Sequence, residues 1–224
     1  MPELDLVTTP EDIVDAALTI GLEAIAITDH NTAEGVDAVR EVAAKKGIWI
    51  IPGVEFSARG GHVLALFDLD TPVERLQELL SRLDLDDEKQ GKGFMATDLW
   101  MDEVFREVEG SGGVAIAAHI DRRQGGFAAS TESLADKKRI HNSRYLSALE
   151  VTIPADRFLW NEGRMPHYSR EVACVQGSDA HAPEEIGRRP LYLNAPSFDL
   201  DSLRLCFRQF RERIRFPEDL FSTQ

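Results

Sequence analysis

The segment VQGSDAH, residues 175–181, places an aspartate and a histidine two residues apart, just beyond a short apolar run. Acidic or imidazole side chains also end three earlier apolar runs, which are residues 24–30 (AIAITDH), 50–55 (IIPGVE) and 114–119 (VAIAAH). In a β/α barrel, the residues that follow the strands gather at one end and form the active site. The sequence therefore predicts a set of strands whose acidic and imidazole side chains meet.

The bulk composition is that of a globular chain with a substantial core. The chain has 224 residues, of which 43% are hydrophobic and 29% are charged. It contains no run of about 18 apolar residues, so no membrane span is predicted. Residues 1–5 are acidic and lack the apolar region of a secretory signal. Cys174 and Cys206 lie in apolar contexts and are predicted to be reduced, which favours a cytoplasmic location.

Charge is distributed unevenly along the chain. The formal net charge of −14 argues against a broad basic surface that grips nucleic acid. The C-terminal helix and tail, residues 197–224, are nevertheless rich in arginine. We interpret this segment as a solvated helix face. Docking of a partner domain or of a phosphate chain is the alternative.

Helix and strand signals alternate along the first fifty residues. A capping threonine, a proline and two acidic residues at positions 9–12 predict a helix start. The next elements are a strand, a helix and a strand, predicted at residues 24–28, 32–46 and 48–51. This succession predicts a largely parallel sheet with crossover helices, and we expect a single α/β domain over residues 1–224.

Later elements follow from the same signals. Further helices are predicted at residues 72–83, 98–109 and 200–210, and further strands at residues 148–152, 173–176 and 191–193. Residues 84–94 are polar and glycine-containing and are predicted to form a mobile loop. Residues 121–144 are polar, irregular and too long for a connector, so we expect a lid or substrate loop there.

One connection departs from the crossover pattern. The segment SARGG, residues 57–61, links two apolar runs and is too short for a crossover helix. It favours a hairpin. An antiparallel return would set the start of the second strand beside the end of the first. The sequence therefore predicts that His62 lies near Glu55.

The residues at these strand ends carry groups that bind metals: Asp29, His30, Glu55, His62, His119, Asp179 and His181. Imidazole nitrogens and carboxylate oxygens are common ligands of zinc, manganese and iron. A glutamate among histidines suits the bridging of two cations, and such a pair promotes phosphoester hydrolysis. Taken singly, a strand-end histidine is more often structural, and we expect Asp29 to cap the next turn or to orient His30.

Other polar residues are assigned from their surroundings. His141 and His167 lie in polar segments and are predicted to be at the surface. Phosphate contacts are predicted for Arg122, Arg123 and Arg188, because guanidinium groups match phosphate oxygens. Ordinary loop solubility is the alternative for these arginines.

Five short motifs together resemble those of the PHP (polymerase and histidinol phosphatase) domain family. They are residues 28–31 (TDHN), 52–55 (PGVE), 61–64 (GHVL), 118–119 (AH) and 177–181 (GSDAH). The resemblance covers about residues 9–193. It implies a distorted (β/α)7 TIM-like barrel with two or three divalent metal ions that hydrolyses phosphoesters. It implies these metal ligands: His30, Glu55, His62, His119, Asp179 and His181. Glu55 would bridge, and His181 or Asp179 would also manage protons.

The first motif of the family, a His-x-His on the first strand, is absent here. Residues 4–7 (LDLV) are expected to form at most a vestigial first strand. Two explanations stay open. Either the chain begins downstream of the true start, or it is a natural variant that holds fewer metal ions.

Three functional classes follow. The leading hypothesis is a metal-dependent phosphoesterase that acts on a nucleotide, a nucleic-acid phosphodiester or a phosphomonoester. The alternative is a catalytically degenerate domain that binds a ligand or partner. An ATPase is one such partner, because residues 187–190 (GRRP) and 196–198 (PSF) are similar to PHP domains fused ahead of ATPase modules. A metal-dependent amidohydrolase would want a lysine at a strand end, and none occurs.

Overall fold

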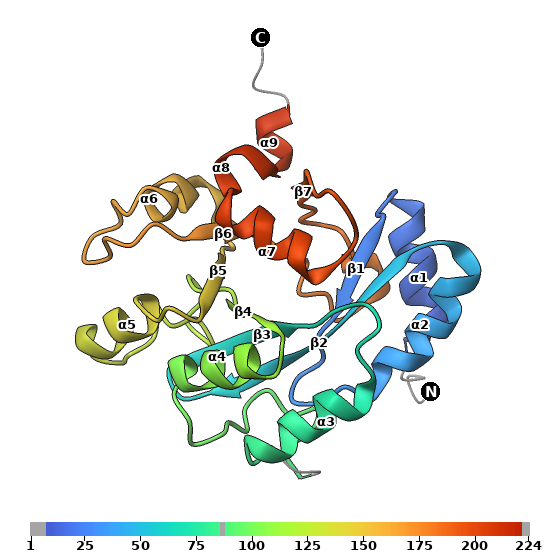
Figure 1. Cartoon of the computed structure of the whole chain (residues 1–224), viewed down its shortest axis with the longest axis horizontal. Coiled ribbons are helices and arrows are strands. Elements are labelled where there is room, and N and C mark those ends of the chain that lie inside the picture. The colour runs from blue at the N-terminus through green and yellow to red at the C-terminus, as the bar shows by residue number, and fades with distance from the viewer. Residues whose placement is uncertain (1–7, 86–87, 221–224) are drawn as a thin grey trace, which may run out of the picture.

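A curled, six-stranded mixed sheet forms the centre of the fold (Figure 1). The computed structural model describes residues 8–85 and 88–220, so the expected vestigial strand at residues 4–7 lies outside the described residues. The strands are β1 (Ala24–Ile27), β2 (Trp49–Ala58), β3 (Gly61–Leu66), β4 (Val114–Ala117), β5 (Leu146–Glu150) and β6 (Ala173–Val175), in that order across the sheet. The predicted distorted barrel of α/β class is confirmed, with a main sheet of six strands rather than seven in the part of the chain described.

Strand direction brings the predicted strand ends together. All pairings in the main sheet are parallel except those of β3, which is antiparallel to both β2 and β4. The carboxyl ends of the five parallel strands therefore lie at the same edge as the amino end of β3. The predicted hairpin is confirmed, and its register pairs Ser57 with His62.

Helices cover the sheet where the sequence expects them. The first, α1 (Pro10–Thr19), is capped by Thr9, whose side chain and backbone exchange hydrogen bonds with Asp12. It is followed by α2 (Gly35–Lys46), α3 (Val73–Arg82) and α4 (Met101–Gly110). Helix α2 packs on β2, and α4 packs on β3 and β4. The start of α2 was predicted three residues too early, because residues 31–34 form a turn.

The second half of the chain differs more from expectation. The predicted irregular segment at residues 121–144 contains α5 (Leu134–His141), capped by Ser133. Further elements are η1 (Pro154–Asp156), α6 (Arg157–Asn161), η2 (Pro183–Glu185), α7 (Leu200–Arg208), α8 (Phe210–Arg213) and α9 (Pro217–Leu220). The strand predicted at residues 191–193 is β7 (Tyr192–Leu193), which pairs with β8 (Ile214–Arg215) outside the main sheet.

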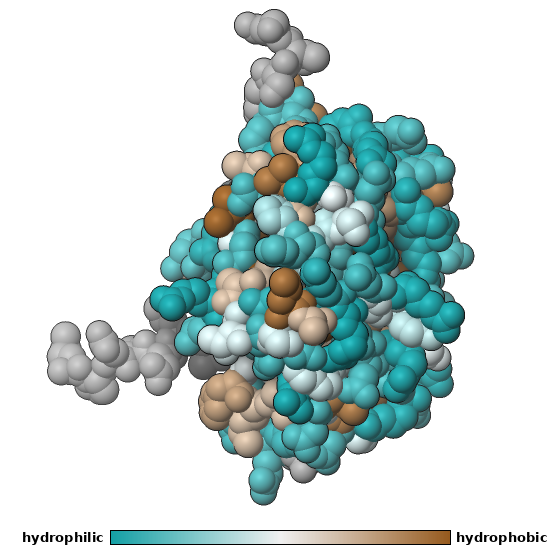
Figure 2. Space-filling view, turned by 90° about the vertical axis from the view of Figure 1, so that its left-hand side faces the viewer, coloured by the Kyte–Doolittle hydropathy of each residue, from teal (hydrophilic) through white to brown (hydrophobic). Residues whose placement is uncertain are grey.

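The surface is largely polar on the face toward α5 and α6, with hydrophobic residues only in small separate groups (Figure 2). No helix in the described residues is both long and apolar enough to cross a membrane. Cys174 and Cys206 are free thiols and are buried, as the sequence predicts. Burial raises the pKa of both thiols.

His141 corrects one expectation. This residue was predicted to be at the surface, but its side chain is fully buried. Its ring packs against both Trp160 and Tyr168, with ring centroids 5.5 and 5.0 Å away. The prediction failed because α5 is mostly polar and only its last turn faces the core. His167 is exposed, as predicted. Burial lowers the pKa of His141 from 6.5 to about 4.

The low pKa of His141 predicts a loss of stability in acid. Because the unfolded chain binds a proton below about pH 6.5 and the folded chain only near pH 4, stability falls as the pH falls between these values. The shift corresponds to roughly 3 kcal/mol. We expect the free energy of unfolding in urea, relative to that of His141→Phe, to fall by about this amount between pH 7 and pH 4. A difference that stays constant with pH would contradict the assignment.

Candidate metal centre

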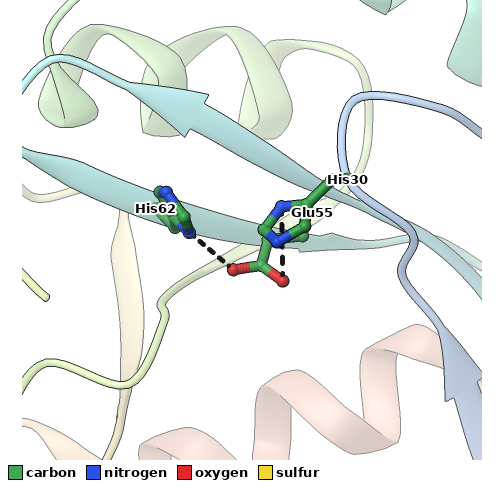
Figure 3. Close-up of side chains that lie close together, drawn as sticks. All are labelled: His30, Glu55 and His62. Carbon is green, nitrogen blue, oxygen red and sulfur yellow. Dashed lines mark hydrogen bonds and ion pairs between the residues drawn. The ribbon is translucent and has the colours of Figure 1, made fainter. Parts of the chain in front are cut away.

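Glu55 lies at the centre of the predicted ligand set. It is a buried residue of β2. Its Oε1 atom lies 2.9 Å from Nδ1 of His62 and 2.9 Å from Nε2 of His119, and its Oε2 atom lies 3.7 Å from Nδ1 of His30. Figure 3 shows the carboxylate between the rings of His30 and His62. Four of the six predicted ligands therefore meet at one carboxylate.

Local backbone structure explains why these side chains converge. His30 follows β1 and forms a parallel bridge with Glu55, held by hydrogen bonds from Asn31 N to Glu55 O (2.9 Å) and from Glu55 N to Asp29 O (3.1 Å). His62 opens β3 beside the end of β2. His119 follows β4 with a φ of 25°, in the left-handed region that non-glycine residues rarely adopt. The three histidines thus lie at strand ends at the same edge, whereas Glu55 lies three residues before the end of β2, which continues to Ala58 instead of ending at Glu55 as predicted.

The electrostatics centre on the Glu55 charge. Burial alone would raise the pKa of Glu55, but hydrogen bonds from His119 and His62 outweigh it, so this pKa lies well below its ordinary value. Burial lowers the pKa of His119, yet the bond to Glu55 reverses the effect and raises it overall. Burial lowers the pKa of His30. A permanent negative charge thus faces three imidazoles, which suits a cation at this position.

An unpartnered nitrogen of His30 shows that the donor set fits a divalent cation. The Nδ1 atom of His30, which faces Glu55, is buried and has no hydrogen-bond partner among the described residues; Nδ1 of His119 is also unpartnered, but that ring faces Glu55 through Nε2. The 3.7 Å spacing between His30 and Glu55 is too long for a hydrogen bond. One ligand atom from each of His30, Glu55 and His62 lies within 4.8 Å of the others. Neutral imidazoles with a carboxylate are a normal donor set for zinc, manganese or iron.

Asp179 and His181 lie at the border of this cluster. Asp179 has a φ of 48° and its carboxylate forms an ion pair with Arg122. The His181 backbone N–H donates to Glu185 (2.8 Å), and its exposed ring lies 3.2 Å from the Asp179 carbonyl oxygen. Neither residue joins His30 in a group spaced for one ion within the described ranges. The negative charge of Asp179 nevertheless opposes the lowering of the His30 pKa by burial and adds a small contribution to the raised pKa of His119.

The predicted phosphate-contact arginines have protein partners in two cases out of three. Arg122 pairs with Asp179, whereas Arg188 donates to the carbonyl oxygens of Ser178 (2.8 Å) and Asp179 (3.3 Å). Arg188 therefore holds the loop after β6. Arg123 is exposed and forms no ion pair with a described carboxylate. Phosphate contact by these three arginines stays a prediction.

The predicted supporting role of Asp29 also stays a prediction. Its side chain is exposed and forms no hydrogen bond with the His30 ring among the residues described. Its carbonyl oxygen accepts the N–H of Glu55 instead. Asp29 thus contributes to the site through its backbone.

Glu150 is a site residue that the sequence reasoning missed. It ends β5, is buried, and accepts the backbone N–H of His119 at 2.9 Å through Oε2. Its Oε1 lies so close to Gly177 that a Cβ there would approach to 2.6 Å. Burial raises the pKa of Glu150. The available signal was an acidic residue that closes an apolar run, the same pattern that identified Glu55.

Asn31, which belongs to the TDHN motif, is a second residue whose role was not predicted from the sequence. It is fully buried, and its Nδ2 donates to the carbonyl oxygens of Lys92 (3.1 Å) and Met95 (2.8 Å). Its Oδ1 accepts the N–H of Ser57 at 2.9 Å. The loop predicted to be mobile is therefore fastened beside His30 from residue 88 onward, while residues 86–87 lie outside the described residues.

A family model matches the chain, and so do short stretches of curated relatives. The model of the PHP domain matches residues 4–152. The chain belongs to the PHP domain family. A 5'-3' exoribonuclease from Haemophilus influenzae is 37% identical over 73 residues, which are 30% of this chain and 27% of that protein. A phosphoribosyl 1,2-cyclic phosphate 1,2-diphosphodiesterase from Eggerthella lenta is 34% identical over 64 residues, 26% of this chain and 24% of that protein.

A solved structure extends the likeness beyond these segments. A lesion-specific endonuclease from Pyrococcus furiosus superposes with a TM-score of 0.68 at 17% identity, over 96% of this chain and 54% of that one. The fold is therefore shared across nearly the whole chain. The chain spans about a quarter of the two curated relatives and about half of the endonuclease. Family membership supports a metal-dependent phosphoester hydrolase in general.

The bond from His119 to Glu150 predicts different effects for two substitutions. Glu150→Gln keeps an oxygen that accepts the His119 N–H, whereas Glu150→Leu removes it. Loss of a group that orients a ligand typically weakens metal binding about 10- to 100-fold. We expect this loss for Glu150→Leu and near-normal Mn²⁺ affinity for Glu150→Gln, measured by equilibrium dialysis on variants with unchanged circular dichroism. Wild-type affinity in Glu150→Leu would show that Glu150 does not support the site.

Proposed function

We propose that this PHP domain is a metal-dependent phosphoesterase that hydrolyses phosphodiesters of nucleotides or nucleic acid. The observation that carries the proposal is the Glu55 carboxylate shared by three imidazoles, two of which keep a buried ring nitrogen without a partner. The names of the two curated relatives, an exoribonuclease and a cyclic phosphate diphosphodiesterase, favour a diester over a monoester.

In this proposal each part of the cluster has a role. His30, Glu55, His62 and His119 would hold the divalent ions, which would be zinc, manganese or iron and would number two or three in a complete family site. Such ions acidify a water molecule and offset charge on a phosphoryl oxygen. Glu55 supplies the charge that retains them, because its carboxylate stays ionised even in acid.

The loop after β6 supplies the remaining groups. Asp179 and His181 would complete the ligand set and transfer protons, and the exposed His181 ring would donate a proton to the leaving oxygen. Arg122 and Arg123, which follow His119 directly, contact the phosphate, and Arg188 keeps the loop in place. For Arg122, this role requires a switch from the Asp179 carboxylate to the substrate.

That ion pair also favours a second candidate. Because its carboxylate is already paired with Arg122, Asp179 is less available as a metal ligand, which suits a catalytically degenerate domain that binds a ligand or partner. An ATPase stays the predicted partner for such a module. In either case we propose that residues 1–224 form one domain, that it includes the helix and tail at 197–224, and that it is cytoplasmic. The packing of α7 against β5 supports the inclusion of the C-terminal helix in this domain.

An assay of metal-reloaded protein separates the two candidates. We expect protein stripped with EDTA to be inactive, and Mn²⁺ or Zn²⁺ to restore hydrolysis of bis-p-nitrophenyl phosphate. The phosphomonoester p-nitrophenyl phosphate should react more slowly, because the proposal assigns a diester. The measurement is release of p-nitrophenol alongside metal content. Full metal occupancy without hydrolysis of either compound would overturn the enzymatic proposal and leave the binding module.

A further inference from the structure

Phe94 is the most exposed of the large hydrophobic side chains described. It is 85% exposed, whereas the next, Phe158, is 54% exposed. Single hydrophobic residues are common at protein surfaces, so exposure alone carries no meaning. Phe94, however, lies beside the candidate metal centre, and this position points to a role for its exposed ring.

The backbone on both sides of Phe94 is fixed to the site. The preceding residue, Gly93, packs so tightly on the His30 ring that a Cβ there would lie 2.7 Å from its Nε2 atom. The carbonyl oxygen of Gly93 accepts the hydroxyl of Ser57 at 2.8 Å. The carbonyl oxygen of the following residue, Met95, accepts Nδ2 of Asn31 at 2.8 Å. The ring is therefore exposed although its attachment is held in place, which lowers the entropy lost when a ligand binds it.

The same segment continues along one rim of the site to a second planar group. Thr97 N donates to Ser57 O (2.9 Å), and Arg59 N donates to Leu99 O (2.8 Å), so the segment runs beside the end of β2. There the Arg59 guanidinium stacks on Trp100, 4.2 Å from the ring centroid. Arg59 is exposed and lies within electrostatic reach of Asp136, but it forms no ion pair with a carboxylate in the described ranges.

We propose that Phe94 stacks on a base of a single-stranded nucleic-acid substrate and that Arg59 contacts a phosphate further along the same strand. The proposal rests on the proposed phosphodiesterase function and names its substrate class. Aromatic side chains bind single strands in this way because every base presents a π-face. A few local contacts of this kind also suit a chain whose net charge of −14 argues against a broad basic surface.

Binding of two matched oligomers tests the proposal without turnover. One is a fluorescent, hydrolysis-resistant phosphorothioate RNA decamer, and the other is its abasic equivalent with the same phosphates. With metal-loaded protein, Phe94→Ala should raise the Kd of the base-containing decamer about 10- to 100-fold and leave the abasic decamer unchanged. Phe94→Trp should retain affinity. The control, Phe158→Ala on α6, removes another exposed phenylalanine and should change neither.

Arg59→Ala has a different signature. It should weaken both decamers alike and reduce the slope of log Kd against log salt by about one, as expected for a single phosphate contact. An effect on the base-containing decamer alone would overturn the phosphate role of Arg59.

Failure of this inference and failure of the proposed function give different results. If Phe94→Ala weakens both decamers equally or neither, or if the wild type binds neither, the stacking role is wrong even where diesters are hydrolysed. If Phe94→Ala weakens only the base-containing decamer while no phosphodiester is hydrolysed, the stacking role stands and the hydrolase proposal falls. A hydrophobic role toward a protein or a lipid would leave both decamers unaffected.

Discussion

The site depends on the interaction of the buried Glu55 carboxylate with the surrounding imidazoles. A buried charge is costly unless hydrogen bonds or opposite charges surround it. Here two imidazoles hydrogen-bond to the carboxylate and a third, His30, lies 3.7 Å away. The arrangement is satisfied only when protons or cations occupy the space between these groups. The site is therefore built to hold positive charge.

The direction of β3 makes this arrangement possible. In an all-parallel sheet, the residue that opens a strand lies at the opposite edge from the residues that close its neighbours. Because β3 is reversed, His62 opens its strand at the same edge where β1, β2 and β4 end. Glu150 then fixes the backbone of His119 from β5, and Asn31 fastens the following loop against His30. Residues on or next to successive strands thus fix the positions of the side chains around Glu55.

Much of this could be predicted from the sequence because the signals are local. Each strand-end residue directly follows or opens an apolar run, and the short SARGG link required a hairpin, so the meeting of His62 with Glu55 followed from position alone. The PHP motifs pointed to the same residues. The sequence did not predict that the main sheet described has six strands. The segment at residues 191–193 resembles a core strand, yet among the described residues it pairs with β8 outside the main sheet.

What the sequence could not supply depends on distant contacts. The Glu150 carboxylate meets a backbone group 31 residues away, and Arg122 meets Asp179 across 57 residues. The burial of His141 depends on Trp160 and Tyr168, which a polar helix gives no reason to expect. No periodicity or motif encodes such pairs.

The metal content of Glu55→Gln tests the central claim most directly. This substitution preserves the shape of the side chain and removes its charge. After dialysis against Mn²⁺ or Zn²⁺ and removal of free ions, elemental analysis should find metal in the wild type and in the control His167→Ala, and almost none in Glu55→Gln. Wild-type metal content in a folded Glu55→Gln protein would contradict the account, because the cation would then be held without the carboxylate that organises the site.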